Sequence, residues 1–328
     1  MKVSVLLAVR NEENNLLPCL SALAKQEFPI ADIEILIGND QSEDRSREII
    51  VNFIKNKPNF QLIDIQRNIG TAKGKGNVIA HLAHHAKGDY FLITDADVCV
   101  PPTWAIAMVA GFAKRANVGV VTGFTVVERK NLLATLDCLD WIHNIGLMNL
   151  ASMLRIPTNS MGNNMAVSKV AYFEMGGIEN QLFMVCEDLL MFKAITKMNW
   201  NFVHLHSPDV LGVTHAQENF TELLQQRQRW LDGALKIHPF LIILLLINGL
   251  FFFPLLVLFF YDWQTALAVW ALRFLFHLSN ISYFASQIQQ TKVLKFLLFY
   301  ELFITFFNPI ILLFYLFPTK MIWKGRKF

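Results

Sequence analysis

Two carboxylates, Asp95 and Asp97, stand one residue apart directly after the apolar run Tyr90–Thr94. At the end of a strand, carboxylates with this spacing can point the same way and share a hard divalent cation. Mg²⁺ or Mn²⁺ held there would fill its shell with diphosphate oxygens and water, and would neutralise charge on a departing diphosphate. A strand-end aspartate is more often a turn or cap residue, so the pair alone is a weak signal.

Two further segments carry reactive groups. Glu187 and Asp188 precede the apolar-periodic stretch Leu189–Ile195, where a carboxylate can serve as a general base for a hydroxyl or simply cap a helix. The segment Gln226–Trp230 precedes the first long apolar run. Its arginines can hold a pyrophosphate and its tryptophan can stack on a sugar or base, or the segment can form a basic, aromatic collar at a membrane surface.

The elements that must position these groups alternate between strand-like and helix-like runs. Continuous apolar strands between helices predict an α/β fold with a parallel sheet covered on both faces. Ligands bind such sheets beyond the carboxyl ends of the strands. The expected strands are Val3–Val9, Ile33–Ile37, Gln61–Ile65 and Tyr90–Thr94, and the expected helices are Leu16–Lys25, Arg45–Lys55 and Val78–Ala86.

Polar residues follow every expected strand, in the segments 10–12, 39–42, 67–77 and 95–97. Each segment offers groups that can hydrogen-bond a polar ligand. The glycines at 70, 74 and 76 fit neither the dinucleotide-binding fingerprint nor the P-loop pattern. The sequence therefore argues against a dinucleotide oxidoreductase and against a P-loop nucleotide hydrolase.

The composition divides the chain into two parts. Hydrophobic residues make up 54% of the 328 residues and charged residues 17%, which excludes a disordered chain and a purely soluble protein. The last 89 residues hold 17 of the 28 phenylalanines and carry a net charge of +5 (seven basic, two acidic), whereas residues 1–239 carry −2 (22 basic, 24 acidic). Because the excess positive charge lies beside membrane-like sequence, no nucleic-acid partner is expected.

Three apolar segments, 239–260, 265–285 and 296–317, are long enough to cross a bilayer. The first two are expected to form a tight antiparallel hairpin, with basic residues at both of its ends on one side, as the positive-inside rule requires. A third crossing would place the basic C-terminus outside, unless the break at Asn308–Pro309 turns the last segment back. Within these segments Arg273 and Glu301 could pair, hold a lipid headgroup, or extend to the membrane surface.

The remaining features favour a cytosolic location for residues 1–236. The four cysteines lie far apart with no metal-binding or disulfide pattern, which is typical of a reducing compartment. The run Val3–Val9 is short and meets Arg10 without a cleavage site, so we interpret it as a strand and not a signal peptide. We predict an integral, multi-pass membrane protein with a cytosolic domain over 1–236 and a membrane domain over 237–328, at the inner membrane if the source is bacterial.

In this order, the motifs resemble those of the family 2 inverting glycosyltransferases, which have the nucleotide-diphospho-sugar transferase (GT-A) fold. The resemblance covers about residues 1–236, and several motifs in order are more specific than any one. It implies an enzyme with a GT-A domain followed by transmembrane helices, a sugar nucleotide (UDP-linked) as donor and Mg²⁺ or Mn²⁺ as cofactor. The motifs are Ala8–Glu13, Asn39–Asp44, Asp95–Asp97, Met161–Ala166, Glu187–Asp188 and Gln226–Trp230.

The resemblance also implies roles at matching positions. Asp188 would take the proton of the acceptor hydroxyl, Asp97 would ligate the metal, and Asp95 would orient the nucleotide and stand beside the metal. The other donor-binding positions are Glu12 and Asp40 for the uridine, Lys75 (or Lys73) near the diphosphate, and Gln226, Arg229 and Trp230 along the site. For His215 there are two interpretations, a metal contact and a structural histidine, of which the second is the simpler. Val9 stands where the family commonly has an aromatic residue, so the contact to the base is expected to differ.

Three apolar segments offer little wall for a polysaccharide channel, which favours transfer of one sugar to a membrane lipid hydroxyl. The stretch Leu132–Leu154 could form an interfacial lobe for that acceptor, or a plain core helix. The alternative function is a subunit of a processive polysaccharide synthase. A membrane scaffold that only binds the sugar nucleotide is a third hypothesis, and the presence of Asp95, Asp97 and Asp188 argues against it.

Overall fold

The computed structural model describes residues 2–154, 156–157, 161–182, 186–234, 239–316, 322–323 and 326–327. It contains two compact units. The first comprises Met1–Thr125 and Asn159–His215, and the second Val126–Thr158 and Ala216–Phe328. The boundary predicted at residue 236 separates a cytosolic part from a membrane part. The two compact units are defined by contacts within the chain and not by a membrane, so this boundary stays a prediction.

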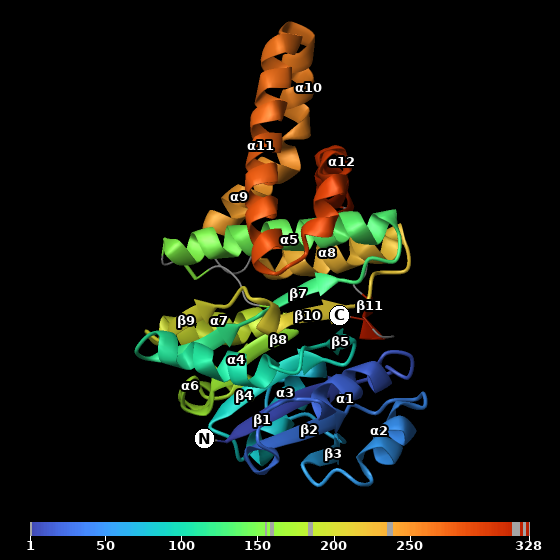
Figure 1. Cartoon of the computed structure of the whole chain (residues 1–328), viewed down its shortest axis with the longest axis vertical. Coiled ribbons are helices and arrows are strands. Elements are labelled where there is room, and N and C mark those ends of the chain that lie inside the picture. The colour runs from blue at the N-terminus through green and yellow to red at the C-terminus, as the bar shows by residue number, and fades with distance from the viewer. Residues whose placement is uncertain are drawn as a thin grey trace. The chain divides into compact units, whose positions relative to one another are not determined.

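A seven-stranded sheet organises the first unit (Figure 1). The four strands expected from the sequence lie side by side and parallel, in the order β3-β2-β1-β4. The sheet continues with β8, which is antiparallel to β4 and β6, so the whole sheet is mixed and not parallel as predicted. The strands are β3 (Phe60–Asp64), β2 (Ile33–Asn39), β1 (Val3–Val9), β4 (Tyr90–Asp95), β8 (Asn164–Ser168), β6 (Val118–Thr122) and β9 (Asn201–His204).

The opposite direction of β8 has a consequence for the edge of the sheet. Asn164, its first residue, pairs with Thr94 near the carboxyl end of β4. The residues that precede β8 therefore reach the same edge as the ends of β1, β2 and β4. A second, three-stranded sheet in the order β5-β10-β7 consists of β5 (Val98–Cys99), β10 (Leu211–Thr214) and β7 (Phe124–Val127).

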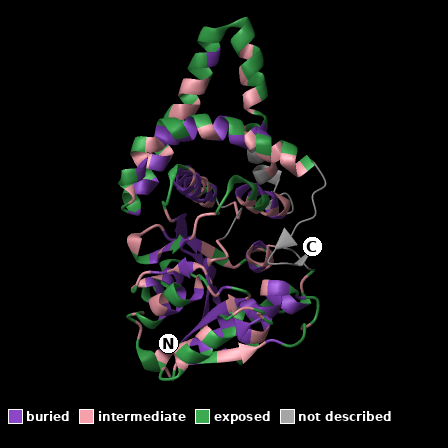
Figure 2. Cartoon of the chain, turned by 90° about the vertical axis from the view of Figure 1, so that its right-hand side faces the viewer, coloured by how far each residue is buried: buried purple, intermediate pink, exposed green. Residues whose placement is uncertain are grey.

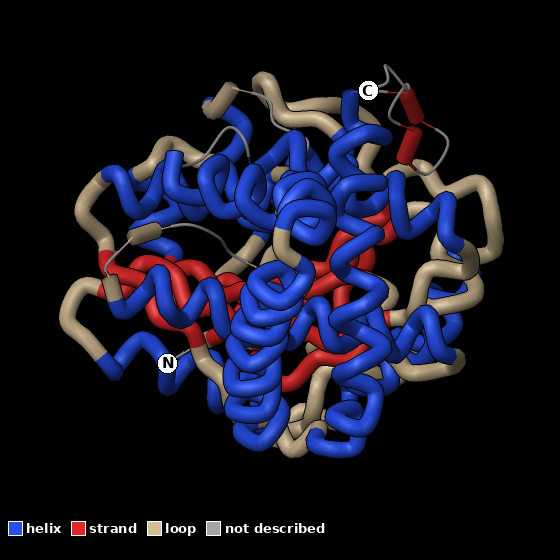
Figure 3. Tube along the Cα trace, turned by 90° about the horizontal axis from the view of Figure 1, so that it is seen from above, coloured by secondary structure: helices blue, strands red, loops and turns tan. Residues whose placement is uncertain are grey.

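Both faces of the large sheet are buried, which explains the continuous apolar strands. In β1, Val5 and Leu7 belong to the hydrophobic cluster on one face, and Leu6 belongs to the cluster on the other. Figure 3 shows strands in red with helices in blue. The helices of this unit are α1 (Leu16–Ala24), α2 (Ser46–Ile54), α3 (Gly74–His85), α4 (Trp104–Gly111), α6 (Lys169–Glu174) and α7 (Glu187–Lys197), with short 3₁₀ turns at Ile30–Asp32, Phe112–Lys114, Ile178–Asn180 and Pro208–Val210.

Helix α3 begins four residues earlier than the apolar pattern predicts, at Gly74 instead of Val78. The first turn is polar and glycine-rich, so propensity alone does not favour a helix there. Long-range contacts stabilise it: the side chain of Asn77 accepts a hydrogen bond from the backbone of Ile69 at 2.8 Å and donates one to the carbonyl of Arg67 at 3.1 Å. The early start places Lys75 on the first turn of a helix.

The second unit is mainly helical. It contains α5 (Leu132–Met153), α8 (Phe220–Ala234), α9 (Pro239–Leu250), α10 (Phe252–Tyr261), α11 (Trp263–Gln287) and α12 (Leu297–Leu316), with a 3₁₀ segment at Thr291–Phe296 and the short strands β11 (Ile322–Trp323) and β12 (Arg326–Lys327). Helices α10 and α11 form the expected hairpin (Figures 1 and 2). Asp262 ends the first helix and caps the second through the backbone N–H groups of Gln264 and Thr265.

The predicted span 239–260 is wrong as one helix, because it consists of α9 and α10 with a break at Phe251. Pro254 accounts for the break. It lacks the N–H that would bond to the carbonyl of Leu250, and its ring crowds that carbonyl. Of the two alternatives for the last segment, the break at Asn308–Pro309 is not observed, since α12 continues through Pro309. Of the C-terminal basic residues, Lys320 and Lys324 lie outside the described residues.

Among the described residues, one helical segment, Thr291–Leu316, is long and apolar enough to cross a membrane. Its neighbour α11 carries the charged residue Arg273, which pairs with Glu301 of α12 at 3.3 Å. Their side chains are 10% and 0% exposed. Of the alternatives for these two residues, the structure shows the ion pair. His277 also contacts Glu301, at 2.5 Å.

Candidate active site

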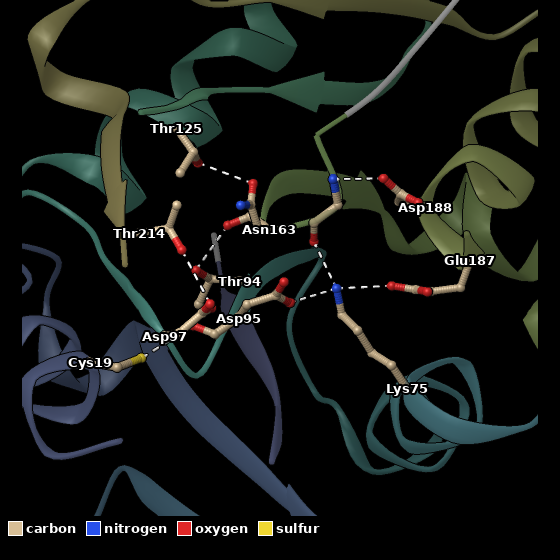
Figure 4. Close-up of polar contacts among 11 residues, drawn as sticks. Cys19, Lys75, Thr94, Asp95, Asp97, Thr125, Asn163, Glu187, Asp188 and Thr214 are labelled. Carbon is tan, nitrogen blue, oxygen red and sulfur yellow. Dashed lines mark hydrogen bonds and ion pairs between the residues drawn. The ribbon is translucent and has the colours of Figure 1, made fainter. Parts of the chain in front are cut away.

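Lys75 lies at the centre of a cluster of carboxylates in the first unit (Figure 4). Its Nζ is 2.6 Å from Oδ1 of Asp95 at the end of β4 and 2.9 Å from Oε1 of Glu187 at the start of α7. It also donates a hydrogen bond to the carbonyl of Gly162 at 3.3 Å. One cation thus joins the first turn of α3, the carboxyl end of β4, the start of α7 and the segment before β8.

The electrostatics of this cluster are dominated by burial and like charges. Burial raises the pKa of Asp95 to about 6, with Lys75 lowering it and Asp97 raising it again. Burial lowers the pKa of Lys75, but Asp95, Glu187 and Asp188 more than compensate, so the ammonium is charged throughout the physiological range. Perturbed carboxylates gathered at a sheet edge are typical of functional sites.

Asp188 is held by a backbone group. Its Oδ2 accepts a hydrogen bond from the N–H of Gly162 at 2.9 Å. Burial and the adjacent Glu187 raise its pKa to about 7, while Lys75 lowers it. A Cβ atom at position 162 would overlap the side chain of Asp188, so only glycine permits this approach. A carboxylate with a pKa near 7 has the value that suits a general base at neutral pH.

Asp97 is oriented from the second sheet. Oδ2 of Asp97 accepts a hydrogen bond from the hydroxyl of Thr214 at 3.2 Å, because β10 pairs with β5 and places Thr214 opposite Val98. The other carboxylate oxygen, Oδ1, is not part of that bond. Among the described residues, no group of three or more His, Cys, Asp or Glu side chains is arranged to hold a metal.

The motif Met161–Ala166 builds the edge of the site. Asn163 accepts hydrogen bonds from Thr94, through its carbonyl at 3.0 Å, and from Thr125, through Oδ1 at 3.1 Å. Asn164 is fully buried, accepts a hydrogen bond from the indole of Trp104 at 2.8 Å, and donates to the carbonyls of Phe124 and Val210. These contacts fix the segment that carries Gly162.

Glu12 and Asp40 lie at adjacent strand ends, since Val9 of β1 pairs with Asn39 of β2. Both are buried. The N–H of Glu12 donates to the hydroxyl of Ser46 at 2.7 Å, and Arg10 donates to the carbonyl of Asp40 at 2.7 Å. The loops that carry the two predicted uridine contacts are thus connected to each other and to α2.

The other predicted residues are distributed differently. Gln226, Arg229 and Trp230 lie on α8 in the second unit, where the amide oxygen of Gln226 is buried without a hydrogen-bond partner among the described residues. Of the two candidate lysines, Lys73 is exposed at the N-cap of α3, and Lys75 contacts Asp95. His215 is half-buried.

Sequence reasoning missed three contributors. The ion pair of Glu187 with Lys75, the hydrogen bond of Thr214 to Asp97 and the close approach of Gly162 to Asp188 all join distant segments. Gly162 and Glu187 each lie inside a motif that the sequence shows, whereas Thr214 has no local signal.

Comparison with solved structures shows the fold. The mannosyltransferase PcManGT of Pyrobaculum calidifontis, in complex with GDP-Man and Mn²⁺, superposes with a TM-score of 0.59 at 17% identity, over 93% of this chain and 87% of that one. TarS 1–349 of S. aureus, in complex with UDP-GlcNAc, has a TM-score of 0.50 at 16% identity, over 100% and 96% of the two chains. The expected GT-A type of α/β fold is confirmed.

Curated relatives resemble the chain over more than two-thirds of its length. It is 26% identical over 237 residues to the poly-beta-1,6-N-acetyl-D-glucosamine synthase of Staphylococcus epidermidis, which is 72% of this chain and 55% of that protein. It is 26% identical over 243 residues to the beta-monoglucosyldiacylglycerol synthase of Synechocystis sp., 71% of this chain and 48% of that protein. The chain spans about half the length of these relatives.

These relatives confirm the expected kinship with the glycosyltransferases. The family model that matches is not that of family 2, which the motifs led us to expect. It is the model of glycosyl transferase family 21, it covers residues 1–328, and the chain therefore belongs to that family.

Proposed function

We propose that the protein transfers one sugar from a nucleoside-diphosphate sugar, UDP-linked, to a hydroxyl of a membrane lipid, with inversion at the anomeric carbon. The observation that carries the proposal is the carboxylate cluster around Lys75, in which Asp188 has a pKa of about 7. An inverting displacement needs a base opposite the leaving diphosphate. Asp188 is suited to take the hydroxyl proton because half of its population is ionised near neutral pH.

The charge balance of the cluster favours a divalent cation. Asp95, Glu187 and Asp188 interact with one lysine, Lys75, and Asp97 acts on Asp95. With every carboxylate ionised, the formal charge of these five side chains is −3 (four negative, one positive). A diphosphate would be repelled unless a further positive charge accompanied it. Oxygen donors of this kind fit Mg²⁺ or Mn²⁺, and we assign Asp97, assisted by Asp95, to hold it. When bound, the metal neutralises charge on the leaving diphosphate.

The remaining donor contacts are proposed from the motif pattern. Lys75 lies beside the carboxylates and would attract the diphosphate. The two buried loop carboxylates would accept hydrogen bonds from the uridine, and α8 would contribute a cation and a stacking surface for a sugar ring. These residues are Glu12, Asp40, Gln226, Arg229 and Trp230.

Our membrane assignment goes beyond Thr291–Leu316, which among the described residues is the one helical segment long and apolar enough to cross a bilayer. We propose that all three apolar segments enter the bilayer and that residues 1–236 face the cytosol. Large apolar side chains are exposed along each of the helices, for example Phe260 at 80%, Leu272 at 68% and Leu316 at 69% (Figure 2). A surface of this kind is stable when a membrane covers it.

Two relatives support different acceptors. The name of the Synechocystis relative gives a glucosyldiacylglycerol as its product, which agrees with a lipid acceptor. The name of the staphylococcal relative gives a polymer, so a subunit of a processive polysaccharide synthase is the second candidate.

The test uses the full chain purified in detergent with membrane lipids, Mn²⁺ and a panel of radiolabelled UDP-sugars. One lipid-extractable sugar per acceptor supports the proposal, whereas a long lipid-free polymer supports the second candidate. Asp97→Asn and Asp188→Asn should each lower transfer at least about a hundredfold while the protein stays folded by circular dichroism. Near-normal turnover by the Asp188 variant would contradict its role as the base.

A further inference from the structure

A buried ion cluster in the second unit has no part in the chemistry proposed above. Nη2 of Arg227, on α8, contacts Oδ1 of Asp137 and lies 2.9 Å from Oδ2 of Asp140, both on α5. The three side chains are 8%, 4% and 12% exposed. Charges of both signs are rarely buried to this degree unless the pairing is specific, because removing one partner leaves an uncompensated charge.

The same cluster reaches α12. Oδ1 of Asp140 accepts a hydrogen bond from the hydroxyl of Tyr300 at 3.1 Å. Tyr300 is fully buried and belongs to Thr291–Leu316, the one helical segment of the described structure that is long and apolar enough to cross a membrane. Asp140 therefore connects α5, α8 and α12 through one carboxylate.

On the other side of Arg227 lies the indole of Trp230. The guanidinium carbon is 4.4 Å from the centre of that ring, within the range of a cation–π contact. Trp141 of α5 meets the same ring edge-on, with centroids 5.1 Å apart. Nε and Nη1 of Arg227 are buried and have no hydrogen-bond partner among the described residues, while the indole of Trp230 stacks against the same guanidinium.

Trp230 is nevertheless 37% exposed. A large ring held on two sides and open on a third is a suitable platform for a sugar ring. Its orientation is set by Arg227, and the orientation of Arg227 is set by Asp137 and Asp140.

We propose that Arg227 is a positioning residue that fixes the indole of Trp230, and that Asp140 and Tyr300 transmit the placement of α12 to it. The inference rests on the proposed function for the sugar that Trp230 meets. That sugar belongs either to the donor or to the acceptor, and the two are distinguished by their separate Michaelis constants.

Arg227→Lys keeps the charge but loses the planar fork and the stacking, and Tyr300→Phe removes only the hydroxyl; neither leaves an unpaired buried carboxylate. We expect Arg227→Lys to raise the KM of the donor or of the acceptor about tenfold and Tyr300→Phe about threefold, with kcat within about twofold. The double variant should resemble Arg227→Lys, because Tyr300 acts through the arginine. Tyr283→Phe, at an exposed position of α11, is the matched control.

A second readout needs no turnover. The contribution of Trp230 to fluorescence, obtained by subtraction of the Trp230→Phe protein, should be quenched more readily by acrylamide in both variants than in the wild type or the control. Unchanged KM values and quenching, additive effects in the double variant, or a fall in kcat alone would overturn the role of Arg227. A wild type that transfers no sugar would overturn the proposed function, and the quenching would still decide the role of Arg227.

Discussion

The pH dependence of catalysis tests the role of Asp188. Its pKa of about 7 results from burial and from the charge of Glu187, opposed by Lys75. A base must be ionised, so activity is lost as the pH falls through that value. With a pKa of about 7, the ionised fraction is about 0.09 at pH 6 and about 0.91 at pH 8. We expect kcat/KM, which reports the free enzyme, to rise about tenfold between these pH values.

Replacing Glu187 by glutamine should move this rise of kcat/KM, the acidic limb of the pH profile, to lower pH. The substitution removes a negative charge from the residue beside Asp188 and leaves Lys75 paired with Asp95. Two charges roughly 7 Å apart at an effective dielectric constant of about 20 interact by about 2.4 kcal/mol, which is about 1.7 pH units. Because Asp188 is partly accessible, screening reduces the effect, and we expect a shift of at least about one unit. Relative activity at pH 6 then rises from about a tenth to about half of the plateau.

The assay measures sugar transfer by the full chain between pH 5.5 and 9, at constant free Mn²⁺, with each variant normalised to its own plateau. Glu48→Gln, on an exposed turn of α2, removes the same charge far along the chain and should leave the limb unchanged. A limb that stays at the same pH in the Glu187 variant, or moves to higher pH, would refute the electrostatic reasoning. A flat profile in the wild type would remove Asp188 as the base.

Two further predictions concern residues that orient the cluster. Thr214→Val removes the hydroxyl that bonds Asp97 and should raise the Mn²⁺ concentration for half-maximal activity about tenfold, with recovery in Thr214→Ser; an unchanged metal titration would contradict this role. Gly162→Ala places a methyl group against Asp188 and should lower kcat about a hundredfold. Gly249→Ala, where a Cβ meets only Leu312 at an ordinary 3.5 Å, is its control, and equal effects of the two alanines would show that the close approach is unimportant.

Local patterns in the sequence were sufficient for the strands that alternate with helices. β1 was predicted at its observed bounds, because seven apolar residues in succession are buried on both faces. The antiparallel β8 was not predicted, since the run Met165–Val167 has the same composition whichever way it points. Direction depends on where the chain re-enters the sheet, and that is a property of the whole topology.

The candidate site was predictable to the extent that it follows strand ends. Asp95 was singled out by its place after an expected strand and Lys75, with Lys73 as the alternative, by the family resemblance, and Asp95 and Lys75 are in contact. The partners that orient them come from far along the chain: Thr214 lies 117 residues from Asp97, and no spacing rule joins them. The two prolines also show that a local feature does not decide the structure by itself. Each lacks a backbone N–H, yet a helix break lies near Pro254, whereas α12 continues through Pro309.

The carboxylate cluster also bears on the balance between stability and activity. Asp95 and Asp188 both have raised pKa values, so the folded protein holds their ionised forms less favourably than the unfolded chain does. By linkage, each carboxylate disfavours the folded state as the pH rises from the ordinary aspartate value towards about 6 or 7. A fold selected for stability alone would place fewer acids around one lysine. Such a local conflict is expected where a charged ligand completes the site, and Lys75, which contacts both Asp95 and Glu187, limits its cost in the free protein.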